Sequence, residues 1–491
     1  MNIVFIDINA LKNGGNIGLG YLSAVLLEKG HRVHVIGNDI GIDAINKRIA
    51  EKDADLIGFS IRSNDTRRIV QLANGIKRKK GSHLICGGPN ITVNGFSFMQ
   101  ENPCFEMAIS GEAEETILDV VEFLQGKKNL REIKGVIGRD AKGVFINEKR
   151  DFTKDLESLP IPDYRVFDIY EKDLRVYGII TSRGCPYNCT YCNGPTVSGK
   201  KLRYRSLDKV IEELVRAKRT YPALRWVDIL DDNFTLNIKR AKEICQAMID
   251  KKLNLQWRLP NGIRADKIDD ELAALMKKAG CKLVKIGIES GSPEIFESIN
   301  KGETLGHIEH GISFLRKNGM RVEGSFIIGL PLSSYEKDLE SVRFAKKLNL
   351  HTATFHIFCP LKKTKAYEQA YEQKGVRVLK DEQETPIEYF SGKPYSVFDT
   401  VDYPEKDRIR AFMKGNLRFN HYLFTRDFSK SPFAIDRALL LAKIIIQYDP
   451  LYIPVHIVRL AKKFILAAGF RVKLALTRAK TDKLQLKEKN I

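Results

Sequence analysis

The chain has 491 residues, which is long for one ordinary domain and predicts two or three. Its hydrophobic fraction of 43% and charged fraction of 29% suit a globular protein and exclude a disordered or collagen-like one. The net charge of +20 points to an anionic partner, such as nucleic acid or a membrane surface. Residues 405–491 contribute +12 of that charge, from 19 basic and 7 acidic side chains, so the excess needs an explanation specific to this segment.

The sequence has no feature of an exported or membrane-spanning chain. Its first residues run directly into an apolar stretch without a basic n-region, and no apolar run reaches the ~18–20 residues that a span needs. The eight cysteines are irregularly spaced, which favours metal ligation or core packing over a disulfide framework. We therefore expect a cytoplasmic protein.

The first 130 residues alternate between short, β-branched apolar stretches and helical stretches. Strands of this kind are buried on both faces, and the alternation predicts an α/β domain with a doubly wound, Rossmann-like parallel sheet. Ligands of that fold bind at the carboxyl ends of the strands, where glycines of this sequence gather. The predicted strands are residues 2–8, 32–36, 55–61, 83–86 and 106–109, and the predicted helices are residues 17–28, 40–51, 66–79 and 113–124.

Three further regions follow along the chain. Residues 131–175 are predicted to form a linker that contains a β-hairpin turned at residues 140–143. Residues 176–375 carry six βα repeats, which predict a partial (β/α)6 barrel with its chemistry at the carboxyl ends of the strands. Residues 376–491 are predicted to be mainly helical, with breaks at prolines. The barrel strands are expected at residues 177–181, 226–230, 255–259, 283–288, 321–328 and 352–358.

Cys185, Cys189 and Cys192 form a C-x₃-C-x₂-C motif directly after the first predicted barrel strand. Three thiolates this close together can bind one soft metal centre. The alternatives are three buried cysteines or part of a zinc site, but structural zinc takes four ligands and no further Cys or His follows at a suitable spacing. The motif therefore favours an iron–sulfur cluster with one iron left open for a substrate.

This motif resembles the signature of radical S-adenosylmethionine (SAM) enzymes, in which the residue before the last cysteine is usually aromatic, as Tyr191 is here. The resemblance implies a [4Fe–4S] cluster on the three cysteines. It also implies that SAM binds the open iron through its amino and carboxylate groups. One electron from the cluster would then cleave SAM into methionine and a 5′-deoxyadenosyl radical.

The ends of the other barrel strands resemble the SAM-contacting segments of the same family. A guanidinium suits the SAM carboxylate, a carboxylate suits ribose hydroxyls, and bare glycine backbone allows the approach of adenine. For Arg264 the alternative is a salt bridge to Asp266, and at residue 231 the chain departs from the Gly-Gly-Glu of many members. The resemblance implies SAM contacts at Tyr191, Asp231, Asp232, Arg264, Glu289, Ser290 and Gly329.

The N-terminal domain lacks the G-x-G-x-x-G dinucleotide fingerprint. Placed before a radical SAM barrel, it resembles the cobalamin-binding domain of cobalamin-dependent radical SAM enzymes, and the combined resemblance covers residues 1 to 370. The corrin would lie over the strand ends and face the barrel mouth. The Asp-x-His-x-x-Gly motif that ligates cobalt in other cobalamin proteins is absent, so we expect the lower cobalt face to be unligated or water-bound. The resemblance implies cobalamin contacts at Asn16, Gly18, Gly20, Ser60, Gly87, Gly88, Pro89, Gly111 and Glu112.

The basic C-terminal segment has apolar residues at helical spacing between residues 457 and 472, with basic residues beside them. Such a helix can cover the barrel as a lid, or it can lie on the anionic inner face of the cell membrane. Nucleic acid has the least support, because no recognition motif accompanies the charge.

Together these features predict a cobalamin-dependent radical SAM methyltransferase that acts on an unactivated carbon. The resemblance implies the following mechanism. One SAM methylates the cobalt, and a second SAM supplies the radical that takes a hydrogen atom from the substrate. The substrate radical then takes the methyl group from the cobalt. A family member that forms rings or oxidises without methyl transfer is the alternative. A non-catalytic metal-binding module that docks on membrane or RNA is an alternative of another class. The expected partners are a small-molecule substrate, lipid-linked or anionic, and an electron donor such as flavodoxin or ferredoxin.

Overall fold

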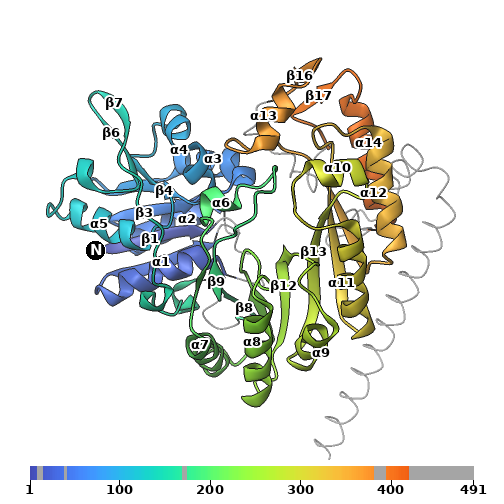
Figure 1. Ribbon diagram of the computed structural model, residues 1–491. Coiled ribbons are helices and arrows are strands. Elements are labelled where there is room, and N and C mark those ends of the chain that lie inside the picture. Colours follow the sequence, from blue (N-terminus) through green and yellow to red (C-terminus); the bar gives the residue numbers. More distant parts are fainter. Residues whose placement is uncertain (8–14, 38–40, 169–173, 381–393, 420–491) are drawn as a thin grey trace, which may run out of the picture. The chain divides into compact units, whose positions relative to one another are not determined.

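The computed structural model describes residues 1–7, 15–37, 41–168, 174–380 and 394–419 (Figure 1). The chain forms two compact units, Met1–Phe412 and Met413–Ile491, and the second is described only over residues 413–419. The predicted amphipathic helix near residues 457–472 lies outside the described residues. Nowhere in the described part of the chain is a helix both long and apolar enough to span a bilayer.

The N-terminal domain is built on a seven-stranded sheet with the order β2-β1-β3-β4-β5-β6-β7. The first five strands are parallel and are connected by helices, so the predicted doubly wound, Rossmann-like fold is confirmed. The strands are β1 (Asn2–Asp7), β2 (Arg32–Gly37), β3 (Leu56–Ser60), β4 (His83–Gly87), β5 (Met107–Ile109), β6 (Val136–Asp140) and β7 (Gly143–Ile146). The helices are α1 (Ile17–Glu28), α2 (Gly41–Glu51), α3 (Thr66–Gly75), α4 (Pro89–Glu101) and α5 (Glu114–Leu124).

The core of this sheet follows from its sequence, because the central strands carry apolar residues on both faces. Positions 3–6 of β1 are fully buried, and the helices cover them on either side. The predicted hairpin is present as β6 and β7, and it does more than link domains. β6 pairs antiparallel with β5, so the hairpin extends the N-terminal sheet at its edge.

The second half of the described chain is a six-stranded parallel sheet with the order β15-β14-β13-β12-β11-β8, and its helices line the outer face (Figure 1). β8 and β15 are its two edges, so the barrel is partial, as predicted. The strands are β8 (Val176–Ile179), β11 (Trp226–Ile229), β12 (Gln256–Ile263), β13 (Cys281–Glu289), β14 (Arg321–Ile328) and β15 (Thr352–Ile357). The helices that follow them are α7 (Leu207–Thr220), α8 (Ile238–Asp250), α9 (Asp270–Lys278), α10 (Pro293–Ser298), α11 (Leu305–Lys317), α12 (Tyr335–Lys347) and α13 (Lys365–Tyr371).

Burial alternates along the barrel strands. On β14, Val322, Phe326 and Ile328 are buried against the helices, while Glu323 and Ser325 are only partly buried on the opposite face. On this strand the face away from the helices therefore carries two polar side chains together with the partly buried Ile327. After the barrel come a small antiparallel pair, β16 (Val376–Val378) with β17 (Phe398–Thr400), and the helix α14 (Glu405–Phe419).

Candidate active site

The cysteine motif lies on a loop at the carboxyl end of β8. Two short strands, β9 (Ser182–Arg183) and β10 (Arg203–Tyr204), pair antiparallel and close this loop at its base. Gly184 has φ +100°, and a Cβ there would be 2.4 Å from the carbonyl oxygen of Lys201, so the close crossing of the two chain segments requires glycine. The loop is thus anchored on both sides of the cysteines.

The three thiols have the chemistry of cluster ligands. All are free, and the backbone N–H of Gly194 donates to Cys192 Sγ at 3.2 Å, which favours an anionic sulfur. Burial raises the pKa of all three thiols, to about 11 for Cys192, while the charges of Arg264 and Lys301 act in the opposite direction on Cys189. Within the described residues no three Cys, His, Asp or Glu side chains are already gathered as a metal-ion site. The fit to an iron–sulfur cluster therefore rests on the donor set: three sulfurs on one anchored loop with cations beside them.

Asp231 and Asp232 follow β11 and hold the base of the cysteine loop. The carboxylate of Asp231 accepts hydrogen bonds from the backbone N–H and hydroxyl of Thr181, both at 2.6 Å, and from the hydroxyl of Ser182 at 2.7 Å. Asp232 accepts from the N–H of Gly184 at 2.9 Å. Burial raises the pKa of both carboxyls. The structure thus assigns them contacts to the loop, and their contact with SAM stays a prediction.

Arg264 follows β12, and its side chain is buried and held by several partners. It forms the ion pair with Asp266 that the sequence offered as the alternative, with Nε 3.0 Å from Oδ1. Its guanidinium also lies 3.8 Å from the centroid of the Tyr187 ring, inside the cysteine loop. The residue predicted to bind the SAM carboxylate is therefore beside the cluster loop, and the contact itself stays a prediction.

A buried cation that the sequence analysis missed lies between the ends of β12 and β13. The ammonium of Lys301 is 3.0 Å from Glu303 Oε1 and 3.5 Å from Glu289 Oε1, and it donates to the carbonyl of Gly287. Glu303 in turn accepts from the backbone N–H of Ala265 at 3.2 Å. No local pattern indicates this network, because Lys301 follows a short helix and reaches back to the preceding strand.

Glu289 ends β13 with φ +67°, an uncommon conformation for a residue with a side chain. Its carboxylate lies beside Tyr191, and burial, followed by this neighbouring charge, raises the pKa of the Tyr191 hydroxyl well above its usual value. Two residues from different strand ends that were predicted to contact SAM are therefore brought together.

Ser290 and Gly329 both lie in tight backbone at strand ends. Ser290 Oγ accepts from the N–H of Ser292 at 3.2 Å. Gly329 has φ +77°, its N–H donates to Asp338 at 2.7 Å, and its carbonyl accepts from Arg408 at 3.1 Å. Hydrogen bonds within the protein thus fix the backbone at both positions, and their SAM contacts stay predictions.

The predicted cobalamin contacts gather at the carboxyl edge of the N-terminal sheet. Ser60 and Gly87 end the neighbouring strands β3 and β4 in register, and Pro89 begins α4. Gly88 has φ +100°, and a Cβ there would be 2.9 Å from the backbone of Ile61. Gly111, with φ +91°, follows β5 and has open space on its Cβ side. Gly88 is therefore required by the packing of the chain itself, Gly111 faces open space, and the cobalamin contacts of these residues stay predictions.

The residues predicted at the start of α1 have a different arrangement. Asn16 caps α1 and accepts from the N–H of Leu19 at 3.2 Å, and Gly18 is exposed. Gly20 is buried, and a Cβ there would be 3.1 Å from Pro162. This segment thus packs partly on the linker, and its cobalamin contacts stay predictions.

Glu112 lies after β5 and is paired with arginines next to the cysteine loop. It accepts from Arg203 at 2.7 and 2.9 Å, from the N–H of Thr153 at 2.8 Å, and lies 3.2 Å from Arg183. Burial opposes the ionisation of Glu112, but the hydrogen bonds from Arg203 and the charge of Arg183 outweigh it, so its pKa is lowered. The carboxylate therefore joins the N-terminal domain to the base of the cysteine loop.

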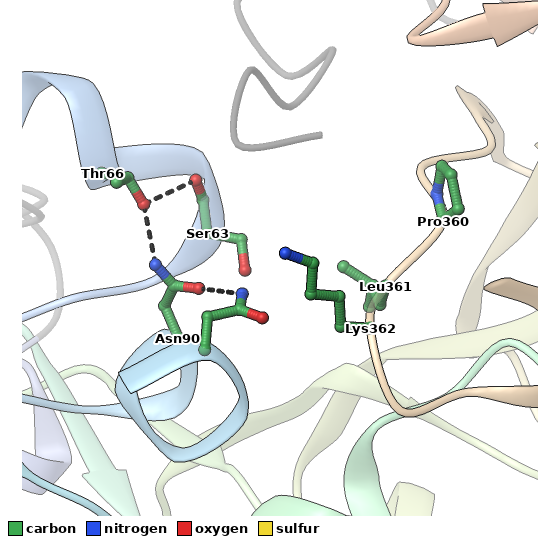
Figure 2. Close-up of a pocket in the computed structure, with 7 residues that line it drawn as sticks. Ser63, Thr66, Asn90, Pro360, Leu361 and Lys362 are labelled. Atoms are coloured by element: carbon green, nitrogen blue, oxygen red, sulfur yellow. Dashed lines mark hydrogen bonds between the residues drawn. The ribbon is translucent and has the colours of Figure 1, made fainter. Parts of the chain in front are cut away.

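A polar cavity lies where the two domains of the first unit meet. It is formed by residues that follow β3, β4 and β15, and Figure 2 shows its two walls. No sequence motif points to its lining residues, which are Ser63, Thr66, Asn90, Asn94, Pro360, Leu361 and Lys362.

Comparisons with known proteins agree with this arrangement. Residues 179–345 match the family model of the radical SAM superfamily, and residues 3–121 match that of the B12 binding domain. An uncharacterised methyltransferase of Pyrococcus horikoshii is 34% identical over 369 residues, covering 73% of this chain and 78% of that protein. Cytidylyl-2-hydroxyethylphosphonate methyltransferase of Streptomyces wedmorensis is 27% identical, covering 70% and 76%. The solved structure of the methyltransferase TsrM from Kitasatospora setae, with cobalamin and a [4Fe–4S] cluster bound, has the same fold, with a TM-score of 0.65 at 17% identity and 76% of each chain covered.

Proposed function

Because the chain belongs to the radical SAM superfamily and carries a B12 binding domain ahead of the radical SAM domain, we propose that it transfers a methyl group to an unactivated carbon. Its cofactors are a [4Fe–4S] cluster, SAM and cobalamin. The observation that carries the proposal is the placement of the cysteine loop. Its helix α6 (Gly194–Val197) contacts α4, which begins at the carboxyl end of β4, so the cluster loop and the cobalamin edge of the sheet are neighbours.

When bound, the cluster and SAM supply a 5′-deoxyadenosyl radical, and cobalamin carries the methyl group. The residues of this chain contribute binding and positioning. Cys185, Cys189 and Cys192 would hold the cluster, and Asp231 and Asp232 fix the base of their loop through its backbone and hydroxyl groups. A loop fixed in this way holds the reacting groups in one geometry, which is the main source of rate that a protein adds to cofactor chemistry.

The polar network at the ends of β12 and β13 would hold SAM. Lys301 and Arg264 carry positive charge, and Glu289 offers a carboxylate that only accepts hydrogen bonds. In this proposal the cations face the SAM carboxylate and Glu289 accepts from the ribose hydroxyls.

Radical SAM enzymes act on a small-molecule substrate and need a reductant, and the same holds for this chain. The finer identities are part of our proposal: an anionic or lipid-linked substrate, a flavodoxin or ferredoxin as donor, a cytoplasmic location, and contact of the basic C-terminal segment with the membrane surface. The phosphonate in the name of the Streptomyces relative supports an anionic substrate. Co-flotation of the full chain with vesicles that contain phosphatidylglycerol tests the membrane contact, which is wrong if the chain stays unbound at low salt.

Anaerobic reconstitution tests the function directly. The wild type should bind about four irons per chain and form 5′-deoxyadenosine from SAM with a reductant. The triple variant Cys185→Ala, Cys189→Ala, Cys192→Ala should do neither, whereas the control Cys104→Ala, a half-buried cysteine of the N-terminal domain, should do both. Equal iron in the triple variant would overturn the cluster assignment. A product that is heavier than its substrate by one CH₂ identifies methyl transfer, and any other mass change favours the ring-forming or oxidising alternative.

A further inference from the structure

Two chain segments lie side by side at the base of the cysteine loop. They are residues 149–154, in the linker, and residues 198–203, which follow the cysteines. Arg203 joins them, because its guanidinium donates to the carbonyl of Thr153 at 2.6 Å and to the carbonyl of Ser198 at 2.7 Å. The two segments therefore form one surface.

Gly199 connects this surface to the first cysteine of the motif. Its carbonyl accepts from the backbone N–H of Cys185 at 2.9 Å. The ring of Phe152 packs against the same glycine, where a Cβ would lie 2.9 Å from it. One hydrogen bond between backbone groups therefore separates the surface from a predicted ligand of the cluster. An electron donor that binds here would come close to the cluster.

Exposed lysines mark this surface, which we call the lysine surface. In the part of the chain that the structure describes, none of their ammonium groups forms an ion pair. Two exposed aspartates, Asp151 and Asp155, lie beside them, so the surface keeps a net positive charge. The lysines are Lys149, Lys154, Lys200 and Lys201.

A neighbouring lysine responds to this positive charge. Lys363, in the connection between β15 and α13, has a lowered pKa. Partial burial is the main cause, and the charge of Lys149 is the second. The two ammonium groups thus repel each other. A surface of one sign attracts partners of the opposite sign and raises their rate of association.

The place of the lysine surface indicates which acidic partner it fits. A membrane or a nucleic acid gains nothing from lying beside the cluster, whereas an electron donor must come close to it. Complexes of electron carriers are small and transient. Charges across such an interface speed the encounter more than they raise the affinity. Exposed lysines beside the cysteine loop suit a complex of this kind.

We propose that the lysine surface docks the electron donor of the enzyme, a small carrier protein with acidic side chains around its redox cofactor. This inference rests on the proposed function, because a radical SAM enzyme needs a reductant. The reduced carrier gives one electron to the cluster and is itself oxidised by one electron, and no bond forms or breaks in this step. The oxidised carrier then leaves, as a transient complex allows.

Titration of the reconstituted holoenzyme with oxidised flavodoxin, followed by flavin fluorescence anisotropy, measures the docking without turnover. Two double variants, Lys200→Glu with Lys201→Glu and Lys149→Glu with Lys154→Glu, should each weaken binding by roughly three- to tenfold at low salt. About 0.5 M salt should remove most of the difference from the wild type. The same titration with ferredoxin identifies which of the two carriers the surface prefers.

The matched control is the double variant Lys251→Glu with Lys252→Glu. These consecutive exposed lysines lie between α8 and β12, at the amino end of a barrel strand and so away from the cysteine loop. The control should bind both carriers as the wild type does.

Formation of 5′-deoxyadenosine from SAM gives a second readout. With reduced flavodoxin as the donor, both surface variants should have a KM for flavodoxin that is raised roughly three- to tenfold. With dithionite, a small reductant that needs no docking surface, they should form 5′-deoxyadenosine at the rate of the wild type. An iron content of about four per chain confirms that the cysteine loop of each variant is intact.

Equal affinity of the surface variants and the control for both carriers would overturn the docking proposal. Weaker binding of the surface variants to phosphatidylglycerol vesicles, at unchanged affinity for both carriers, would overturn it too and assign the lysines to a membrane. Absence of 5′-deoxyadenosine from the wild type with dithionite would instead count against the proposed function.

Discussion

The strongest structural prediction concerns Glu112, the carboxylate that joins the N-terminal sheet to the base of the cysteine loop. Its side chain is 9% exposed and that of Arg203 is 6% exposed, so the pair is shielded from solvent. Glu112→Gln keeps the shape but replaces one accepting oxygen with an NH₂ that faces guanidinium donors. Removing one partner of a buried ion pair costs about 3–5 kcal/mol. In this variant Arg203 still donates to the carbonyls of Thr153 and Ser198. We therefore expect a loss of folding stability at the lower end of that range, about 3 kcal/mol.

Urea unfolding followed by tryptophan fluorescence measures this cost, because both tryptophans, Trp226 and Trp257, lie on barrel strands. The control is Glu115→Gln, three residues on, whose side chain is 61% exposed and pairs with Arg150 at 2.9 Å; it should cost less than about 1 kcal/mol. The lowered pKa of Glu112 also sets a pH dependence. Its stabilisation is complete above 4.5, the ordinary pKa of a glutamate, and is lost as the pH falls through the lower value of the folded state. Equal shifts for the two variants at pH 7, or a Glu112→Gln deficit that does not shrink in acid, would refute the reasoning.

Three further changes test other parts of the structure. Burial, and to a lesser degree the charge of Lys285, lowers the pKa of His356 to about 4. Between this value and the ordinary pKa of 6.5, the histidine is protonated in the unfolded chain but not in the folded one. The wild type should therefore lose about 3 kcal/mol of folding stability as the pH falls from 6.5 to 4. Thermal unfolding of His356→Gln should lack that loss, and a parallel pH profile would contradict the assignment. Gly291→Ala places a Cβ 2.5 Å from the Cβ of Phe344 and should destabilise the fold by about 1–3 kcal/mol. The control is Gly306→Ala in the helix α11, where the new Cβ has nothing closer than 3.6 Å. It should be neutral or stabilising in the same unfolding assay. Asp231→Asn should lower iron affinity by roughly 10- to 100-fold, because it loosens the base of the cysteine loop; full iron content with weaker SAM binding would instead support the direct SAM contact predicted from the sequence.

The sequence was sufficient for the fold and for the cysteine loop. Apolar, β-branched runs indicate where the strands lie, and the motifs follow the predicted strand ends one after another along the chain. Both sheets could therefore be predicted. The hydrogen-bond and ion-pair partners of individual side chains could not be predicted. The atoms that Asp231 binds come from the turn after another strand, 49 and 50 residues earlier, and Arg203 lies 91 residues from Glu112. Such contacts depend on how elements pack in three dimensions, and no local pattern contains that information.

Similar long-range contacts join the two domains of the first unit at the candidate site. Arg183, two residues before Cys185, pairs with Glu114 at 2.6 Å as well as with Glu112, so the N-terminal domain neutralises a buried charge at the start of the cysteine loop. On the far side of the cysteines, α6 contacts α4. The loop is therefore held from both ends by the domain that binds cobalamin. A change at that interface, such as Glu112→Gln, should disturb the cluster even though it touches no cysteine, which makes iron content a second measure of the same contact.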